Sequence, residues 1–317
     1  MLPIAIALAA LLLFPAAAAA DGLPAVGIDA KPLSLPDAEV AYVTESAKDS
    51  TRLIERARYG GPLRQRRVRG AFSLPAVAYD GSPGGLSADG RTLVLISPRV
   101  RYPRRRTSFA VVDARRLAVR ERIGLKGDFS FDAISPDGRV MYLIEYNPRD
   151  YGEYAVRAYD LGTGRLLPRP VVDPREADEP MTGVPVTRET SRHGRWAYTL
   201  YQSPEHPFVH ALDTERRTAV CIDLDDLSQV WNGSLAIRGG TLEVLGRRGR
   251  VLARIDTRTH RLVKPRPPRA KDAGTSWLPL AAPTAALLLL AAVTRRRLGQ
   301  SADDRQARLR RRSVTGR

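Results

Sequence analysis

The stretch that decides the fold reads LSADGR over residues 86–91 and runs directly into the apolar segment TLVLI at 92–96. Asp-Gly is a turn signal, because glycine adopts positive φ angles without steric cost and such turns join neighbouring antiparallel strands. The segment that follows is rich in β-branched and other apolar residues, which favour a strand. This stretch therefore predicts a tight turn with a positive φ angle at Gly90, followed by a strand.

The same combination of turn and strand recurs along the chain. ISPDGR at 134–139 precedes VMYLI and predicts the same turn at Gly138, and TSRHGR at 190–195 precedes WAYTL. Weaker copies are LPDA at 35–38, before VAYV, and IRGG at 237–240, before LEVL. We therefore expect five copies of one unit between residues 32 and 265.

A second sequence signal recurs with a similar spacing to the first. An apolar run ends in an aspartate and a polar turn at four places, Asp113, Asp160, Asp213 and Asp256, which lie 47, 53 and 43 residues apart. An aspartate at a strand end accepts hydrogen bonds from the backbone N–H groups of the turn. Repeated units of three or four strands and about 40 to 50 residues are typical of propeller blades, which need stacking against neighbours and closure into a ring. We predict an all-β fold, a β-propeller of about five recognisable blades, with an open β-sandwich as the alternative.

These motifs resemble the YVTN and TolB-like family of bacterial β-propeller repeats. The resemblance rests on SADGR at 87–91, on SPDGR at 135–139 and on the four aspartate turns, and it covers most of residues 33–264. It implies a propeller architecture, commonly of six or seven blades. It implies no particular function, because propellers serve as enzymes, receptors and scaffolds.

Both ends of the chain carry apolar segments. The first is followed by five alanines up to Ala20 and has the pattern of a signal peptide, although no Lys or Arg precedes its apolar core, so an uncleaved anchor is the alternative. The second, residues 277–293, has no charge, and the three arginines that follow it favour a cytoplasmic side there; a buried core helix is its alternative. We predict a signal peptide at 1–20, an extracytoplasmic β-propeller-like repeat domain at 21–264, a Pro-rich stalk at 265–275, a transmembrane helix at 276–294 and a basic cytoplasmic tail at 295–317.

Composition adds little about function. The formal net charge is +17, but arginine far outnumbers lysine, which is typical of GC-rich coding, so the charge is a weak functional signal. Cys221 is the single cysteine, and therefore no intrachain disulfide forms. Because Val220 and Ile222 flank it, we expect Cys221 to be a small buried residue of a strand.

The sequence contains few candidates for catalysis or metal binding. His206 and His210 share one face of a strand and, with Glu205, form a weak metal candidate. The acidic loops at 173–179 and 223–226 lack the alternation of a calcium loop, and neither a phosphate-binding loop nor a Gly-x-Ser-x-Gly elbow is present. We expect no metal, no cofactor and no catalytic residue.

The most unusual feature is a basic loop between two predicted strands. We expect its arginines to lie in solvent, where guanidinium groups bind phosphate or carboxylate in pairs. The alternative is a solvated loop enriched by codon usage. The candidate anion-binding residues are Arg101, Tyr102, Arg104, Arg105 and Arg106.

These features predict a single-pass protein of the cell membrane, with the bulk of the chain extracytoplasmic and the C-terminus cytoplasmic. The expected function is a non-catalytic binding or scaffold module for an anionic envelope polymer or a protein partner. Its other partner is the lipid bilayer, and nucleic acid is not expected. The alternative is a propeller-fold enzyme (a hydrolase, a lactonase or a quinoprotein-like dehydrogenase), for which acids and histidines must converge on a central channel. The candidates for that role are Asp132, Glu145, Glu189, His210 and Glu243.

Overall fold

The computed structural model describes residues 30–100, 102–150, 152–179 and 181–263. These residues form eighteen β-strands in five antiparallel sheets, and a short 3-10 turn lies at Arg247–Gly249. The predicted all-β fold is confirmed, and the five sheets match the five copies of the turn signal. The predicted signal peptide, stalk, transmembrane helix and tail lie outside the described residues. Within the described ranges, no helix is long and apolar enough to cross a membrane.

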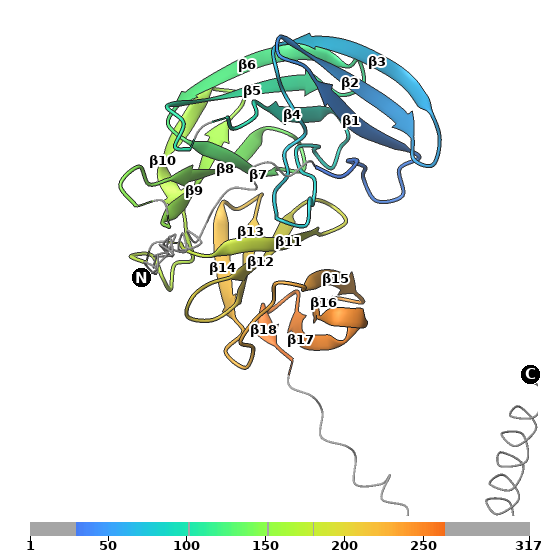
Figure 1. Ribbon diagram of the computed structural model, residues 1–317. Coiled ribbons are helices and arrows are strands. Elements are labelled where there is room, and N and C mark those ends of the chain that lie inside the picture. The colour runs from blue at the N-terminus through green and yellow to red at the C-terminus, as the bar shows by residue number, and fades with distance from the viewer. Residues whose placement is uncertain (1–29, 101, 151, 180, 264–317) are drawn as a thin grey trace, which may run out of the picture. The chain divides into compact units, whose positions relative to one another are not determined.

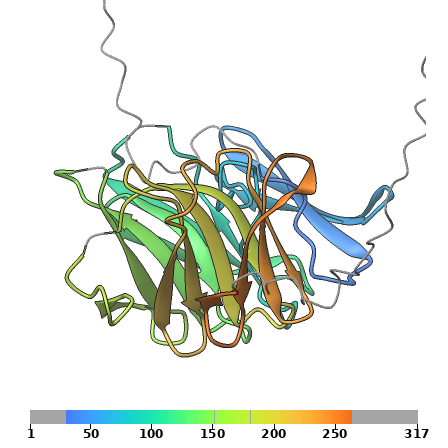
Figure 2. The same ribbon diagram turned by 90° about the horizontal axis from the view of Figure 1, so that it is seen from below.

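The sheets follow one another along the chain, and in each sheet consecutive strands are neighbours (Figure 1 and, turned by 90°, Figure 2). The first sheet contains β1 (Val40–Ser46), β2 (Ser50–Ala57) and β3 (Pro62–Arg69). The second contains β4 (Thr92–Ile96), β5 (Arg106–Asp113) and β6 (Ala118–Lys126). The third contains β7 (Phe129–Ile134), β8 (Val140–Tyr146), β9 (Tyr154–Asp160) and β10 (Arg165–Val171). The fourth contains β11 (Val184–Thr190), β12 (Trp196–Gln202), β13 (Phe208–Asp213) and β14 (Thr218–Asp223). The fifth contains β15 (Ser234–Arg238), β16 (Thr241–Leu245), β17 (Val251–Asp256) and β18 (Arg261–Leu262).

Each sheet has an inner edge and an outer edge. The strands β4 and β7 are almost entirely buried, whereas β3 is exposed at every residue except Val68. In Figure 1, β3 and β6 lie on the outside, and β4 and β7 lie toward the common centre. The first two sheets gain a minimal fourth strand from single bridges, Leu33 to Tyr42 and Leu86 to Leu93. The arrangement of the five sheets is therefore propeller-like.

Apolar side chains between consecutive sheets make up the core. Four clusters join the first sheet to the second, the second to the third, the third to the fourth and the fourth to the fifth. Burying a side chain of the size of leucine or phenylalanine stabilises the fold by about 1.5–3 kcal/mol. Each cluster contains large side chains from both of its sheets: Leu53 and Leu93, Phe109 and Phe131, Tyr142 and Leu212, and Leu200 and Leu242.

The expected closure of the sheets into a ring by a further blade interface is not found. In the part of the chain that the structure describes, no apolar cluster joins the fifth sheet to the first. Instead, residues 73–85, here called the central insertion, leave the first sheet and pair with the inner strand of the fourth. The N–H groups of Tyr79 and Asp80 donate to the carbonyl oxygens of Pro185 and Val186 at 2.9 and 3.2 Å.

The recurring turn has one hydrogen-bond pattern. Ser135 Oγ donates to Asp137 Oδ1 at 2.6 Å and accepts from the N–H of Val140 at 2.9 Å, and the N–H of Gly138 donates to the Ser135 carbonyl oxygen at 2.9 Å. The turn at 87–92 repeats these bonds. The second signal also behaves as expected, because the carboxylate of Asp160 accepts from the N–H groups of Thr163 and Gly162, which lowers its pKa.

The predicted positive φ angles at Gly90 and Gly138 are confirmed, with values of 67° and 69°. The two positions differ in their surroundings. A Cβ atom at Gly138 would lie 2.4 Å from Thr92 Oγ1, in the second sheet, whereas a Cβ atom at Gly90 would have only Leu35 nearby, at 3.6 Å. The turn of the third sheet is therefore packed directly against the second sheet.

Replacing either glycine with alanine tests this difference. Gly90→Ala should destabilise the chain by about 1–2 kcal/mol, the cost of a left-handed conformation for an L-residue. Gly138→Ala should cost more, because the turn must also move away from Thr92. Thermal melts of the two full-length variants measure the difference, and equal melting temperatures would contradict the packing described here.

Candidate functional site

The basic loop between β4 and β5 folds back onto the protein. The side chains of Arg99 and Arg104 are only 7% and 8% exposed, and both form ion pairs with Asp128, which is 4% exposed and directly precedes β7. Arg99 Nε donates to Asp128 Oδ1 at 3.0 Å, and the backbone N–H of Arg104 donates to Asp128 Oδ2 at 2.9 Å. Burial, followed by the charge of Arg99, lowers the pKa of Arg104 to about 10. Arg104 therefore stays charged at neutral pH, and the ion pairs of both arginines with Asp128 hold the loop in place.

Two aromatic rings complete this anchor. The guanidinium of Arg99 lies 5.5 Å from the centre of the Tyr102 ring and 5.0 Å from that of Tyr146, and the two rings meet edge to face. Cation–π contacts of this kind add stability where the cation is shielded from water. Tyr102 is therefore part of the contact between the loop and the third sheet.

The expectation that Arg104 lies in solvent is wrong. Its counter-charge, Asp128, lies on the next sheet, so the sequence around the loop does not reveal it. Arg105 and Arg106 are exposed as expected, and Arg101 lies outside the described residues. Anion binding by this loop stays a prediction, now carried by Arg105 and Arg106.

The five residues considered for catalysis are spread over separate sites. Asp132 forms a buried ion pair with Arg188, Glu145 pairs with Arg157, and Glu243 pairs with Arg254. Asp132 and Glu189 line one cavity of about 310 Å³ near the central insertion, where burial raises the pKa of Glu189. His210 lines a different cavity.

The cavity that contains His210 lies between the loop that joins β10 to β11 and the strands β13 and β14, and it has a volume of about 170 Å³. Its walls bring together the two acidic loops that the sequence shows as separate, and they also include His206, His210 and Glu205. His206 Nε2 lies 3.2 Å from Asp223 Oδ1. Cys221, expected to be a buried residue without a role, is only partly buried and lines the same cavity.

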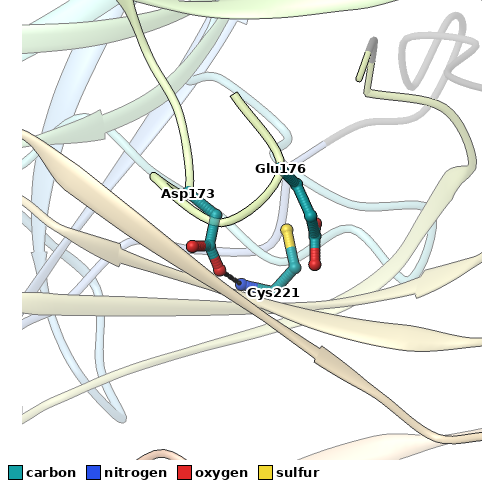
Figure 3. A group of neighbouring side chains, drawn as sticks. All are labelled: Asp173, Glu176 and Cys221. Atoms are coloured by element: carbon teal, nitrogen blue, oxygen red, sulfur yellow. Dashed lines mark hydrogen bonds between the residues drawn. The ribbon is translucent and has the colours of Figure 1, made fainter. Parts of the chain in front are cut away.

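Three side chains approach each other closely in this cavity (Figure 3). One ligand-type atom from each of Asp173, Glu176 and Cys221 lies within 4.8 Å of the other two. Asp173 accepts from the N–H of Cys221 at 2.9 Å and from Arg175 Nε at 3.1 Å, so its carboxylate is fixed in position. These three residues supply two carboxylates and a thiol, which are donors for a divalent metal ion.

Burial and charge shift the pKa values of two side chains in this cavity. Burial, and then the charge of Glu176, raise the pKa of the Cys221 thiol well above its usual range. The imidazole of His210 is 2% exposed, and burial lowers its pKa to about 4. Its Nε2 atom is buried without a hydrogen-bond partner. The thiol is therefore protonated and the imidazole neutral at neutral pH.

Sequence reasoning missed the association of Cys221 with Asp173 and Glu176. The acidic loop at 173–179 was visible as a run of carboxylates, but its position beside β14 depends on how the third and fourth sheets pack. One signal was available in the sequence, namely the alternation of inward and outward side chains in β13 and β14. His210 lies directly opposite Cys221 in the strand register.

The buried ion pairs of the basic loop predict how two substitutions change the stability of the chain. Asp128→Asn should destabilise the chain by about 3–5 kcal/mol, because two buried guanidinium groups lose their counter-charge. Arg105→Ala should change stability by no more than about 0.5 kcal/mol, because its side chain is exposed. Thermal melts of both full-length variants measure this, and a larger loss for Arg105→Ala than for Asp128→Asn would show that the loop is anchored differently.

The buried imidazole of His210 predicts how the stability of the chain depends on pH. The unfolded chain protonates His210 near its ordinary pKa of about 6.5, but the folded chain does so only near 4, so the unfolded state binds the extra proton between these values. Folding stability should therefore fall by about 3 kcal/mol as pH drops through this range. In urea titrations at several pH values, His210→Gln should remove this part of the acid sensitivity. His193→Gln, on an exposed turn, should retain it.

Comparisons with known proteins leave the family open. No family profile matches the chain, and no curated protein matches it. Among solved structures, the chain is similar to Kuenenia stuttgartiensis hydrazine synthase, with 17% identity and a TM-score of 0.41 over 70% of this chain and 75% of that one. It is similar to TolB from Acinetobacter baumannii, with 16% identity and a TM-score of 0.35 over 62% of this chain and 43% of that one. It is also similar to a putative 6-phosphogluconolactonase from Bacteroides uniformis, with 16% identity and a TM-score of 0.43 over 74% and 69%. At these values the likenesses carry no argument about function, and the propeller-like architecture rests on the chain's own five sheets.

Proposed function

We propose that this chain is a membrane-anchored, extracytoplasmic binding module without catalytic activity, and that its ligand is an anionic polymer of the cell envelope. The observation that supports this proposal is a basic surface on the outer strands of the first two sheets. We call it the outer arginine surface and define it by Arg66, Arg67 and Arg69 of β3 and Arg115 of the turn before β6.

The arginines of β3 are available to a ligand. All three are exposed, and among the described residues no carboxylate bonds to their side chains. Arg67 lies directly opposite Arg52 in the register of β2 and β3, but Arg52 forms an ion pair with Glu45. The charge available to a ligand at this edge therefore comes from the arginines of β3 themselves.

The basic surface continues from the first sheet to the second. Arg64 Nη1 donates to the carbonyl oxygen of Arg115 at 2.6 Å, and Arg122 Nη2 donates to the carbonyl oxygen of Arg69 at 2.8 Å. These bonds hold β3 beside β6 and its preceding turn. The exposed arginines of β3 therefore lie along one edge beside the second sheet, with Arg66 on one face of the strand and Arg67 and Arg69 on the other.

An anionic polymer suits this surface better than a small anion does. Each exposed guanidinium binds a carboxylate, sulfate or phosphate only weakly, because water screens the pair. A polymer engages several sites at once, and the second and later contacts form at a high effective concentration. Binding of this kind weakens as salt is added.

The enzyme alternative has less support. Catalysis by acids and bases needs them within reach of one reacting atom. Here Asp132, Glu145 and Glu243 are each paired with an arginine at separate places. Such pairing suits a structural role.

The membrane anchor belongs to the proposal as well. It is supported by the uncharged run at 277–293, which is long enough to reach across a bilayer, and by the three arginines at 295–297. This orientation would place the outer arginine surface outside the cytoplasm, where it meets envelope polymers.

A binding experiment on membranes tests ligand and topology together. Spheroplasts that produce the full chain should bind fluorescent dextran sulfate from the medium, and the binding should decrease as salt increases. The triple variant Arg66→Gln, Arg67→Gln, Arg69→Gln should lose most of this binding, on the order of tenfold in affinity, because roughly 1.4 kcal/mol of charge–charge contact is enough for that change.

The matched control removes the same charge elsewhere. Arg165, Arg169 and Arg247 are exposed residues without an ion pair in the described part of the chain, and their replacement with glutamine should leave binding nearly unchanged. An equal loss in both triple variants would reduce the effect to net charge and contradict a specific surface. Binding only to inside-out vesicles would contradict the topology.

A further inference from the structure

The cavity between the β10–β11 loop and the strands β13 and β14 has the donor set of a metal centre. We infer that Asp173, Glu176 and Cys221 bind one divalent cation of the zinc class. This site is separate from the outer arginine surface, which lies on the first two sheets, and it does not depend on the function proposed for that surface.

The spacing of the three side chains suits a single ion. Ligand atoms that lie 2.0–2.3 Å from a zinc ion are roughly 3–4 Å apart from one another. The ligand-type atoms of Asp173, Glu176 and Cys221 already lie within 4.8 Å of one another. Shifts of about an ångström therefore suffice to close the group around an ion.

An unpartnered buried imidazole points to a ligand independently of this cluster. His210 is 2% exposed, its Nε2 atom has no hydrogen-bond partner, and it lines the same cavity. Because His210 lies opposite Cys221 on neighbouring antiparallel strands, both side chains project from the same face of the sheet. A buried polar atom without a partner is costly. A bound ion, or a water molecule on that ion, would supply the missing partner.

The surroundings of Asp173 resemble the outer shell of a metal site. Carboxylates that bind metals are usually hydrogen-bonded by further groups that fix their orientation. Both oxygens of the Asp173 carboxylate accept from Arg175: Oδ1 from its backbone N–H and Nε, and Oδ2 from its Nε and Nη2. Oδ2 also accepts from the backbone N–H of Cys221, and Arg175 donates to the Cys221 carbonyl oxygen at 2.8 Å. Arg175 therefore orients one ligand and offsets part of the negative charge of the three.

The donor types select the class of metal. A thiolate beside carboxylates and an imidazole suits zinc and similar borderline ions, whereas calcium and magnesium prefer oxygen alone. Binding converts the Cys221 thiol to a thiolate: the S–H bond breaks, a sulfur–metal bond forms, and the proton leaves to solvent. No change of oxidation state is involved. Affinity should consequently rise with pH.

The only cysteine of the chain provides a direct test. Purified full-length protein is titrated with Zn²⁺, and the rate at which Cys221 reacts with a thiol reagent is followed. One equivalent of Zn²⁺ should slow this reaction at least tenfold, and Co²⁺ should produce a sulfur-to-cobalt charge-transfer absorption. A thiol that reacts equally fast at saturating Zn²⁺ would overturn the inference, and this measurement needs no variant.

Variants separate this site from adventitious binding. Cys221→Ser and Glu176→Gln should each lower the Zn²⁺ affinity by at least about tenfold, since even outer-shell changes at metal sites have effects of this size. Asp178→Asn removes an exposed carboxylate of the same loop and should leave the affinity unchanged. Unchanged Zn²⁺ affinity in Cys221→Ser would assign the metal to other surface groups, such as His206, and reject the site.

Discussion

Small sheets with apolar side chains on both faces have to cover those faces, and in this chain they cover one another. Each of the four apolar clusters is shared by two consecutive sheets, so no sheet has a core of its own. Repeat architectures in general draw stability from the interfaces between neighbours. The turns, the cavities and the outer strands all take their positions from this stacking.

Features set by local sequence were predictable. The turns at Gly90 and Gly138 and the aspartate turn at Asp160 depend on neighbours within five residues, and the structure has the expected φ angles and hydrogen bonds there. The minimal inner strands of the first two sheets were not predictable in detail. Each consists of one bridge, at Leu33 and at Leu86, and a single bridge leaves no periodic pattern in the sequence.

Features set by contacts between sheets were beyond local reasoning. Arg104 looks like part of a solvated basic loop until Asp128, which is 24 residues away, provides its counter-charge. Cys221 is a second example, because Asp173, which accepts a hydrogen bond from its backbone N–H, is 48 residues away in the sequence. Charge and cysteine content alone indicated neither the buried anchor nor the donor cluster. Both sites therefore follow from the fold.

The central insertion completes its hydrogen bonds only with residues of the fourth sheet, which lie about a hundred residues further along the chain. Thr187 Oγ1 donates to Asp80 Oδ2 at 2.9 Å across a sequence separation of 107 residues. The backbone groups of Tyr79 and Asp80 find their partners only after β11 has formed, although the first two sheets have all their strands well before it along the chain. Contacts of such long range close late and slow the approach to the native state. Both ends of the central insertion are bonded to the second sheet, Ser73 to Ile96 and Gly85 to Val94. A chain that ended before Val184 would therefore still hold the insertion at its two ends, but Tyr79 and Asp80 at its tip would lack their partners in the fourth sheet.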